Sequence, residues 1–235
     1  FFSRSFNRDI GGWDVSNVTN MSGMFENADN FDQDIGEWNV SSVVSMSRMF
    51  VGGIFGQDIS TKVVNKGTSE EYTAWDVSSV RRMRQMFFEA TFNRDIGNWN
   101  VSNVTDMSSM FYGAWSFNQD IGDWNVSNVR NMGSMFEGGF SRSNPFNQDI
   151  GEWDVSAVTN MRSMFKGAEF FNQDLGAWDV SAVGDQFTGI DKMEGIFDDA
   201  GLSTTNYDRT LTGWARRDLN AGLTLGASGI EYCNS

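Results

Sequence analysis

Several chemically active residue types are scarce in this chain. Its 235 residues include no histidine, one cysteine (Cys233) and one proline (Pro145). Histidine is the side chain that most often transfers protons near neutral pH, so its absence removes the commonest general acid or base. A single cysteine cannot form an internal disulfide, which leaves the redox compartment open. No run of 18 apolar residues occurs, so no membrane insertion is expected in this stretch.

Positive charge is also scarce. The chain has 17 basic residues against 31 acidic ones, and its formal net charge is −14. Phosphate groups would be repelled by this balance, which argues against nucleic acid and anionic membranes as partners. The clustered basic residues are Arg81, Arg82 and Arg84, followed later by Arg216 and Arg217. We interpret both clusters as solvated surface.

One stretch of about 20 residues is repeated along the chain. Residues 117–136 read FNQDIGDWNVSNVRNMGSMF, close copies begin at Phe6, Phe31, Phe92 and Phe146, and looser copies begin at Phe55 and Phe171. A repeat period between 20 and 50 residues indicates a solenoid, in which each coil buries its apolar face against its neighbours. We therefore expect a seven-repeat array over residues 1–201, with residues 1–5 as the tail of a truncated repeat.

The apolar spacing within a repeat predicts its local structure. Ile121, Trp124 and Val126 have the spacing of a leucine-rich repeat, and the alternation of Trp124 and Val126 predicts a short parallel strand on a concave face. The pattern from Val129 to Phe136 predicts a helical or 3₁₀ segment on the convex face. The expected fold class is an α/β repeat solenoid, a right-handed leucine-rich-repeat-like coil.

Most of the recurring residues are interpreted as structural. The paired methionines, such as Met132 and Met135, and the tryptophan series are expected to fill the core, because methionine suits irregular gaps and tryptophan is in phase with valine. One aspartate per repeat precedes a turn and is expected to accept hydrogen bonds from backbone N–H groups there. These turn aspartates are Asp9, Asp34, Asp58, Asp95, Asp120, Asp149 and Asp174.

Three insertions and a distinct C-terminal segment depart from the repeat. The insertions cover residues 60–74, 139–145 and 184–190, and insertions in solenoids form loops on one face that are often used for binding. Residues 202–235 are expected to form a C-terminal capping segment, which starts with a helix capped by Ser203 or Asn206. Residues 223–225 and 230–232 are predicted as short strands.

The motifs W-[DN]-V-S-x-V-x-x-M-x-x-M-F and F-N-Q-D-I-G resemble those of the BspA-like leucine-rich repeat family of surface proteins. The match recurs seven times and covers nearly the whole chain. The resemblance implies an extracellular or cell-surface location and a role in adhesion or protein binding. It brings no catalytic residues with it.

Polar residues that follow each tryptophan and valine form the candidate ligand-binding surface. On a concave face they would align in ladders, as Asp14, Asn39, Asp76, Asn100, Asn125, Asp154 and Asp179, with Ser127, Ser156 and Ser181 beside them. Four carboxylates on adjacent coils form a tentative calcium site, because calcium prefers oxygen ligands and would relieve their repulsion. These are Asp123, Glu152, Asp154 and Asp179.

Two functions remain open from the sequence. The first is a non-enzymatic extracellular recognition or adhesion module that binds a protein or glycan through its concave Asp/Asn/Ser face. The alternative is a structural spacer or subunit of an extracellular assembly that contacts other copies or subunits, with calcium as the one candidate ion. An enzyme is not expected, because the sequence shows no histidine and no activated nucleophile.

Overall fold

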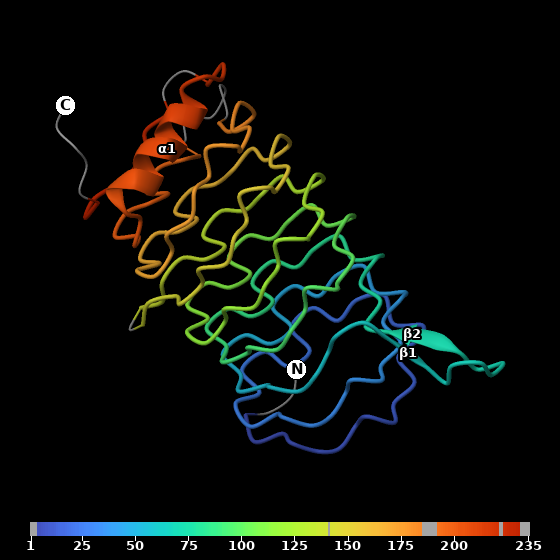
Figure 1. The fold of residues 1–235 in the computed structure, drawn as a ribbon. Coiled ribbons are helices and arrows are strands. Elements are labelled where there is room, and N and C mark those ends of the chain that lie inside the picture. Colours follow the sequence, from blue (N-terminus) through green and yellow to red (C-terminus); the bar gives the residue numbers. More distant parts are fainter. Residues whose placement is uncertain (1–3, 141, 185–191, 221–222, 231–235) are drawn as a thin grey trace.

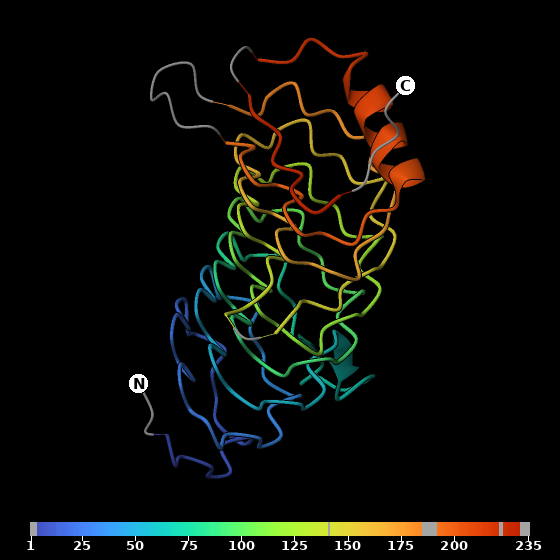
Figure 2. The ribbon, with the colours of Figure 1, turned by 90° about the vertical axis from the view of Figure 1, so that its left-hand side faces the viewer.

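The computed structural model describes residues 4–140, 142–184, 192–220 and 223–230. The chain winds as a stack of coils, with the N-terminal residues at one end and helix α1 (Thr204–Trp214) at the other (Figures 1 and 2). Strands β1 (Lys62–Val64) and β2 (Tyr72–Ala74) form an antiparallel hairpin that projects from the side of the stack (Figure 1). Within the described ranges, no helix is both long and apolar enough to span a membrane.

Neighbouring coils are joined by parallel backbone pairing. Single parallel bridges link Asn20, Ser45, Arg82, Asp106, Asn131 and Asn160 in sequence. Beyond each bridge, alternate N–H groups donate to the next coil, as Met132 does to Asn160 O (2.9 Å) and Ser134 does to Arg162 O (2.8 Å). The bonds repeat from coil to coil, so the stack is held by a continuous row of backbone hydrogen bonds, which we call the paired edge and which runs through the methionine pairs.

This edge is not where the sequence predicts the strand. Around Trp124 and Val126 the backbone is irregular, and it lies between two turns. The N–H of Trp124 donates to Ile121 O (3.1 Å) and the N–H of Val129 donates to Val126 O (2.8 Å). Because these local bonds close turns on both sides, residues 124–126 do not pair with the neighbouring coil as a strand; in another coil, a single bond of this kind joins the N–H of Trp75 to Trp38 O (3.1 Å). Its alternation in sequence reflects which side chains point inward.

The segment from Val129 to Phe136 is not helical either. The N–H of Met135 donates to Met132 O (3.1 Å), but the intervening Ser134 has a φ of 57°. A residue in the left-handed region interrupts a right-handed helix, and the N–H of Phe136 then donates to Met164 O of the following coil (2.9 Å). Arg48, Gln85, Ser109 and Ser163 have the same conformation in other coils. Successive turns therefore produce the i, i+3 spacing that predicted a helix.

The inward-facing side chains form one continuous core. Met132, Met135 and Phe136 are fully buried, and the ring of Phe111 stacks on Phe117 (3.9 Å between centroids) and on Phe136 (5.7 Å). The indole N–H of Trp124 donates to Ile96 O of the preceding coil (3.0 Å). The predicted core role of the methionines and tryptophans is confirmed, except in the first coil, where Trp13 is 49% exposed and Met24 is partly exposed.

Helix α1 closes the C-terminal end of this core. Ser203 is its N-cap and accepts a hydrogen bond from the N–H of Asn206 (3.3 Å), as predicted. Trp214 continues the tryptophan series, because its indole N–H donates to Leu175 O (2.8 Å). No strand is present in residues 223–230, although Gly226 O accepts the N–H of Phe197 (3.0 Å) and so extends the pairing between coils.

Candidate functional site

The residues predicted to line a concave binding face lie in local turns. In each of the seven turns, the Asp or Asn side chain after the tryptophan accepts the N–H of the serine two residues later, as Asp154 does from Ser156 (3.1 Å). The same bond is made by Asp14, Asn39, Asp76, Asn100, Asn125 and Asp179. The predicted ligand-binding serines Ser127 and Ser181 are the donors in two of these turns. These residues therefore have a structural role.

The electrostatics of these turns agree with this role. The hydroxyl and N–H of Ser16 lower the pKa of Asp14, and Ser181 lowers the pKa of Asp179 in the same way. The predicted turn aspartates behave alike, since Asp120 accepts the N–H of Gly122 (3.0 Å) and its six counterparts make the equivalent bond. Their prediction as structural residues is confirmed.

The tentative calcium ligands are not brought together. In the part of the chain that the structure describes, no group of three or more His, Cys, Asp or Glu side chains is placed to hold a metal ion. Asp154 and Asp179 bond their own turns, and Asp123 and Glu152 are exposed. Carboxylates on successive coils thus face solvent separately.

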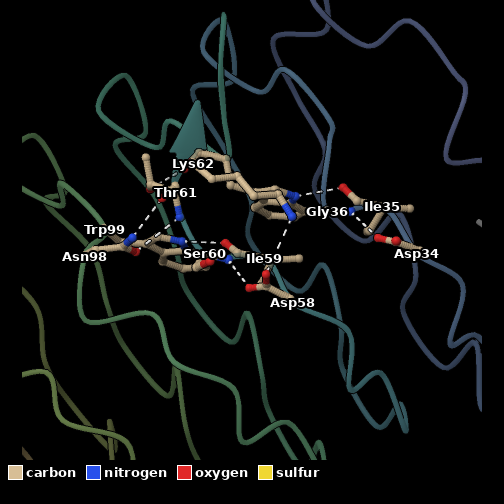
Figure 3. Close-up of polar contacts among 11 residues, drawn as sticks. Asp34, Ile35, Gly36, Asp58, Ile59, Ser60, Thr61, Lys62, Asn98 and Trp99 are labelled. Atoms are coloured by element: carbon tan, nitrogen blue, oxygen red, sulfur yellow. Dashed lines mark hydrogen bonds and ion pairs between the residues drawn. The ribbon is translucent and has the colours of Figure 1, made fainter. Parts of the chain in front are cut away.

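The first insertion, residues 60–74, forms the β1–β2 hairpin. Its base is fixed between coils, because Thr61 exchanges hydrogen bonds with Asn98 (3.2 and 2.9 Å) and Lys62 Nζ lies 3.5 Å from Asp58 Oδ2 (Figure 3). The hydroxyl of Tyr72 donates to Glu37 O (2.6 Å). The hairpin is therefore a fixed projection, and its tip is polar and exposed. In the third insertion, residues 185–190 lie outside the described residues, as does Cys233.

The second insertion, residues 139–145, is anchored by a buried asparagine. Asn144 is fully buried, its side-chain amide donates to Phe111 O (2.7 Å), and its Oδ1 accepts the N–H of Phe146 (3.0 Å). The loop also passes close to the neighbouring coil, where a Cβ on Gly113 would lie only 3.0 Å from the Cα of Gly139. This anchoring places Phe140 and Arg142 on the outer surface of the stack.

Aromatic side chains from three coils gather beside this insertion. The ring of Phe88 stacks on Tyr112 (4.5 Å between centroids), and Tyr112 lies 6.0 Å from Phe140. The guanidinium of Arg142 lies 4.6 Å from the centroid of Trp115. Phe140 is 86% exposed, although other parts of the protein lie close enough to cover it. Such exposure is unusual for a large apolar side chain.

These side chains border two adjoining recesses, which we call the aromatic hollow. The larger has a volume of about 660 Å³ and the smaller about 290 Å³, and Gly139, Phe140 and Arg142 line both. The other charged and aromatic side chains that line one or other recess are Glu89, Tyr112, Trp115, Glu137, Lys166, Glu169 and Asp199. The volumes are in the range of small-ligand sites, which combine apolar walls with a few polar groups.

The hollow contains more negative than positive charge. Burial raises the pKa of Glu137 above its ordinary value of 4.5, and opposing effects of Ser134, Lys166 and Arg162 are smaller. Burial also raises the pKa of Tyr112, with contributions from the carboxylates of Glu137 and Glu89. These groups therefore affect one another across the hollow. A ligand there would meet hydrogen-bond acceptors and aromatic faces.

A further recess of about 650 Å³ lies beside α1, and no aromatic side chain lines it. Its four carboxylates are those of Asp149, Glu152, Asp174 and Asp208. Two of them are engaged in turns, because Asp149 accepts the N–H of Gly151 (2.9 Å) and Asp174 accepts the N–H of Gly176 (2.9 Å). Since it has no aromatic or other large apolar wall, this recess is a weaker candidate for ligand binding than the aromatic hollow.

Comparison with known families identifies the repeat. The family described as "Mycoplasma protein of unknown function, DUF285" matches residues 1–72, 61–141 and 137–219. The chain belongs to the DUF285 family. The three matches overlap and run from end to end of the coil stack, which agrees with its repetitive organisation. No curated protein and no solved structure matches the chain.

The sequence of this DUF285 chain predicts only part of the hollow. The insertion at 139–145 departs from the repeat, but the sequence pattern predicts no role for Tyr112, Trp115 or Glu137. Comparison of the repeats with one another does give a signal for this site. Tyr112 directly follows the last phenylalanine of its repeat, and the same position holds Glu26, Val51 and Lys166 in other coils. Large aromatic residues at exposed repeat positions mark the site.

Proposed function

We propose that this protein is a non-enzymatic recognition module that binds a neutral glycan in the aromatic hollow. The observation that carries the proposal is Phe140, which is 86% exposed at the rim of a recess lined by Tyr112 and Arg142. The resemblance to BspA-like leucine-rich repeat proteins supports an extracellular or cell-surface location and a role in adhesion. The proposal moves ligand contact from the Asp/Asn/Ser turns to the insertion at 139–145.

The chemistry of the hollow favours a glycan. Aromatic faces pack against the C–H groups of a sugar ring, and carboxylates accept hydrogen bonds from its hydroxyl groups. The hollow offers both, with Phe140, Tyr112 and Trp115 beside Glu89, Glu137, Glu169 and Asp199. Its excess of carboxylates over the cations of Arg142 and Lys166 disfavours an anionic ligand. A neutral sugar suits this combination best.

The proposal is tested with a panel of immobilised neutral glycans and the Phe140→Ala variant. An exposed side chain contributes little to folding, so the variant should keep the melting temperature of the wild-type protein. An aromatic residue at the centre of a contact contributes about 2 kcal/mol or more to binding, so affinity for any glycan that the wild-type protein retains should fall roughly thirtyfold. Ile54→Ala is the matched control, since Ile54 is 49% exposed and lies outside the hollow.

Each outcome of this experiment has a defined meaning. Loss of binding in Phe140→Ala but not in Ile54→Ala supports the proposal. Unchanged binding in Phe140→Ala, with loss in a variant carrying Asp14→Lys, Asp154→Lys and Asp179→Lys, would return the site to the turns. If the wild-type protein retains no glycan and instead self-associates in solution, the spacer or subunit function replaces recognition.

A further inference from the structure

Arginines gather on one face of this otherwise acidic stack. Met83 points into the core, which leaves Arg81, Arg82 and Arg84 exposed on the outside of one coil. Arg48 lies one coil earlier, and its N–H donates to Arg84 O (2.8 Å). Arg130 occupies the same position two coils after Arg81. The coil between them contributes Thr105, whose N–H donates to Arg81 O and whose carbonyl accepts the N–H of Arg130 (both 2.9 Å). We call these five residues the arginine face.

The guanidinium groups of three of these arginines have no partner in the described part of the chain. No ion pair or hydrogen bond there involves the guanidinium group of Arg81, Arg82 or Arg84, whereas that of Arg48 pairs with Glu26 and donates to Gln85 (2.9 Å). Arg130 donates to the carbonyl of Ala157 (3.0 Å). The face therefore presents unneutralised guanidinium groups in a chain whose net charge is −14.

The backbone beneath the arginine face is rigid and its other side chains are small. Arg82 is bridged to Ser45 on one side and to Asp106 on the other. Asp106 is held by Ser108, whose N–H (3.0 Å) and hydroxyl (2.7 Å) donate to it. Ser45 and Ser108 are buried, and their hydroxyl groups donate to Ser47 and Asp106, so the ligand contacts of this face are left to the arginines. Guanidinium groups bind sulfate and carboxylate groups bidentately.

This face lacks the apolar anchors of a protein interface. The strongly exposed large hydrophobic residues of the described chain are Trp13, Ile54, Val63, Phe140, Phe170 and Leu219. None of them belongs to the four neighbouring segments that form this face and its surroundings, residues 44–48, 81–85, 105–109 and 130–134. Protein interfaces depend on buried aromatic or aliphatic anchors, so a purely polar polymer fits this surface better than a protein.

The shape of the positive region favours a narrow linear polymer. Coils are spaced by about 4.8 Å, so Arg81 and Arg130, two coils apart, are separated by about 10 Å along the stack. Charges are screened beyond about 8 Å at physiological salt, so only groups close to the arginines are attracted. A membrane surface or a nucleic acid duplex would cover a wider area and so bring its phosphates against acidic residues of a chain whose net charge is −14. We infer that the arginine face binds a linear acidic polysaccharide that carries sulfate or carboxylate groups.

The test uses dextran sulfate as the probe, with uncharged dextran for comparison, in titration calorimetry at about 50 mM and about 150 mM salt. The variant combines Arg81→Thr, Arg82→Asn and Arg84→Ser, which places the residues of other coils (Thr105, Asn131 and Ser108) at these positions. The control combines Arg8→Thr, Lys66→Asn and Arg216→Ser, which removes three exposed cations elsewhere and gives the same net charge. Equal melting temperatures establish that both are folded.

The expected result is binding of dextran sulfate by the wild-type and control proteins and a loss of roughly tenfold or more in the variant. Each neutralised charge contributes about 0.7–0.9 to the slope of log K against log salt, so this slope should fall by about two units in the variant. Equal losses in variant and control, or equal binding of dextran, would overturn the inference. So would equally tight binding of poly-glutamate or single-stranded DNA. Phe140→Ala separates this surface from the aromatic hollow, because it should bind dextran sulfate normally.

Discussion

Replacing Trp214 with alanine tests whether α1 completes the core of the stack. Trp214 is 2% exposed, its indole N–H donates to Leu175 O (2.8 Å), and its ring lies 5.8 Å from that of Phe197. It thus makes the contacts that a tryptophan in one coil makes with the preceding coil. Because a coil in a repeat stack is stabilised only by its neighbours, removing this residue should weaken the last coils directly.

The magnitude follows from these contacts. Truncation of a buried tryptophan to alanine costs about 3–5 kcal/mol, and loss of its hydrogen bond adds about 1 kcal/mol. Leu175 O also accepts the N–H of Trp178 (3.1 Å), so the carbonyl is not left without a partner. We therefore expect a loss of about 4–6 kcal/mol for Trp214→Ala. Trp214→Phe keeps most of the ring and should lose about 1–2 kcal/mol.

The assay is urea unfolding followed by tryptophan fluorescence. The control is Trp13→Ala, the same substitution at the opposite end, where the side chain is 49% exposed. It should cost about 1.5 kcal/mol or less, since less area is buried. If Trp214→Ala is no more destabilising than Trp13→Ala, α1 does not belong to the continuous core and this reasoning is refuted.

Two further predictions concern single side chains. Asp120→Ala should lower the free energy of unfolding by about 1 kcal/mol, because it removes the acceptor of the Gly122 N–H. The control, Asp123→Ala, changes an exposed residue and should alter this free energy by less than about 0.5 kcal/mol; equal effects of the two substitutions in urea titrations would contradict the turn role. Burial raises the pKa of Glu137 in the folded protein above its ordinary value of 4.5, so the folded state binds the carboxyl proton more tightly than the unfolded state does. The protein therefore loses stability as the pH rises from the unfolded-state pKa through the folded-state pKa. Glu137→Gln removes this loss, so the stability of the variant relative to the wild-type protein should increase from acidic to neutral pH. If the difference in melting temperature between the two proteins is constant with pH, the raised pKa is not coupled to folding.

The sequence predicts those features that depend on local chemistry. The turn aspartates, the Ser203 cap and the burial of Met132 and Met135 follow from side-chain type and spacing alone. Each is decided within a few residues, and each recurs in every coil or at one helix end. Such features need no knowledge of how the coils stack.

The sequence misplaces the features that depend on backbone conformation between coils. Positive φ at Arg48, Gln85 and Ser134 has only a weak sequence signal, because none of them is glycine and the left-handed conformation is uncommon for such residues. The signal lies in two other coils, where the equivalent residues are Gly23 (φ 65°) and Gly195 (φ 69°). An i, i+3 apolar pattern is shared by helices and by successive turns, so the segment was predicted as a helix. The aromatic hollow was missed for a related reason, since the stacking of coils brings Phe88 and Tyr112 from neighbouring repeats into contact with the insertion.

Repetition itself separates structural from functional residues in this chain. The Asp/Asn–Ser turns are present in all seven coils, so each offers a ligand the same contacts and none defines a unique position. Phe140, Trp115 and Arg82 occur at positions that other coils fill differently, and the exposure of Phe140 and Arg82 shows that stacking does not require them. Residues that depart from the repeat and add nothing to the core are therefore the best candidates for specific recognition. Both proposed surfaces, the aromatic hollow and the arginine face, consist largely of such residues.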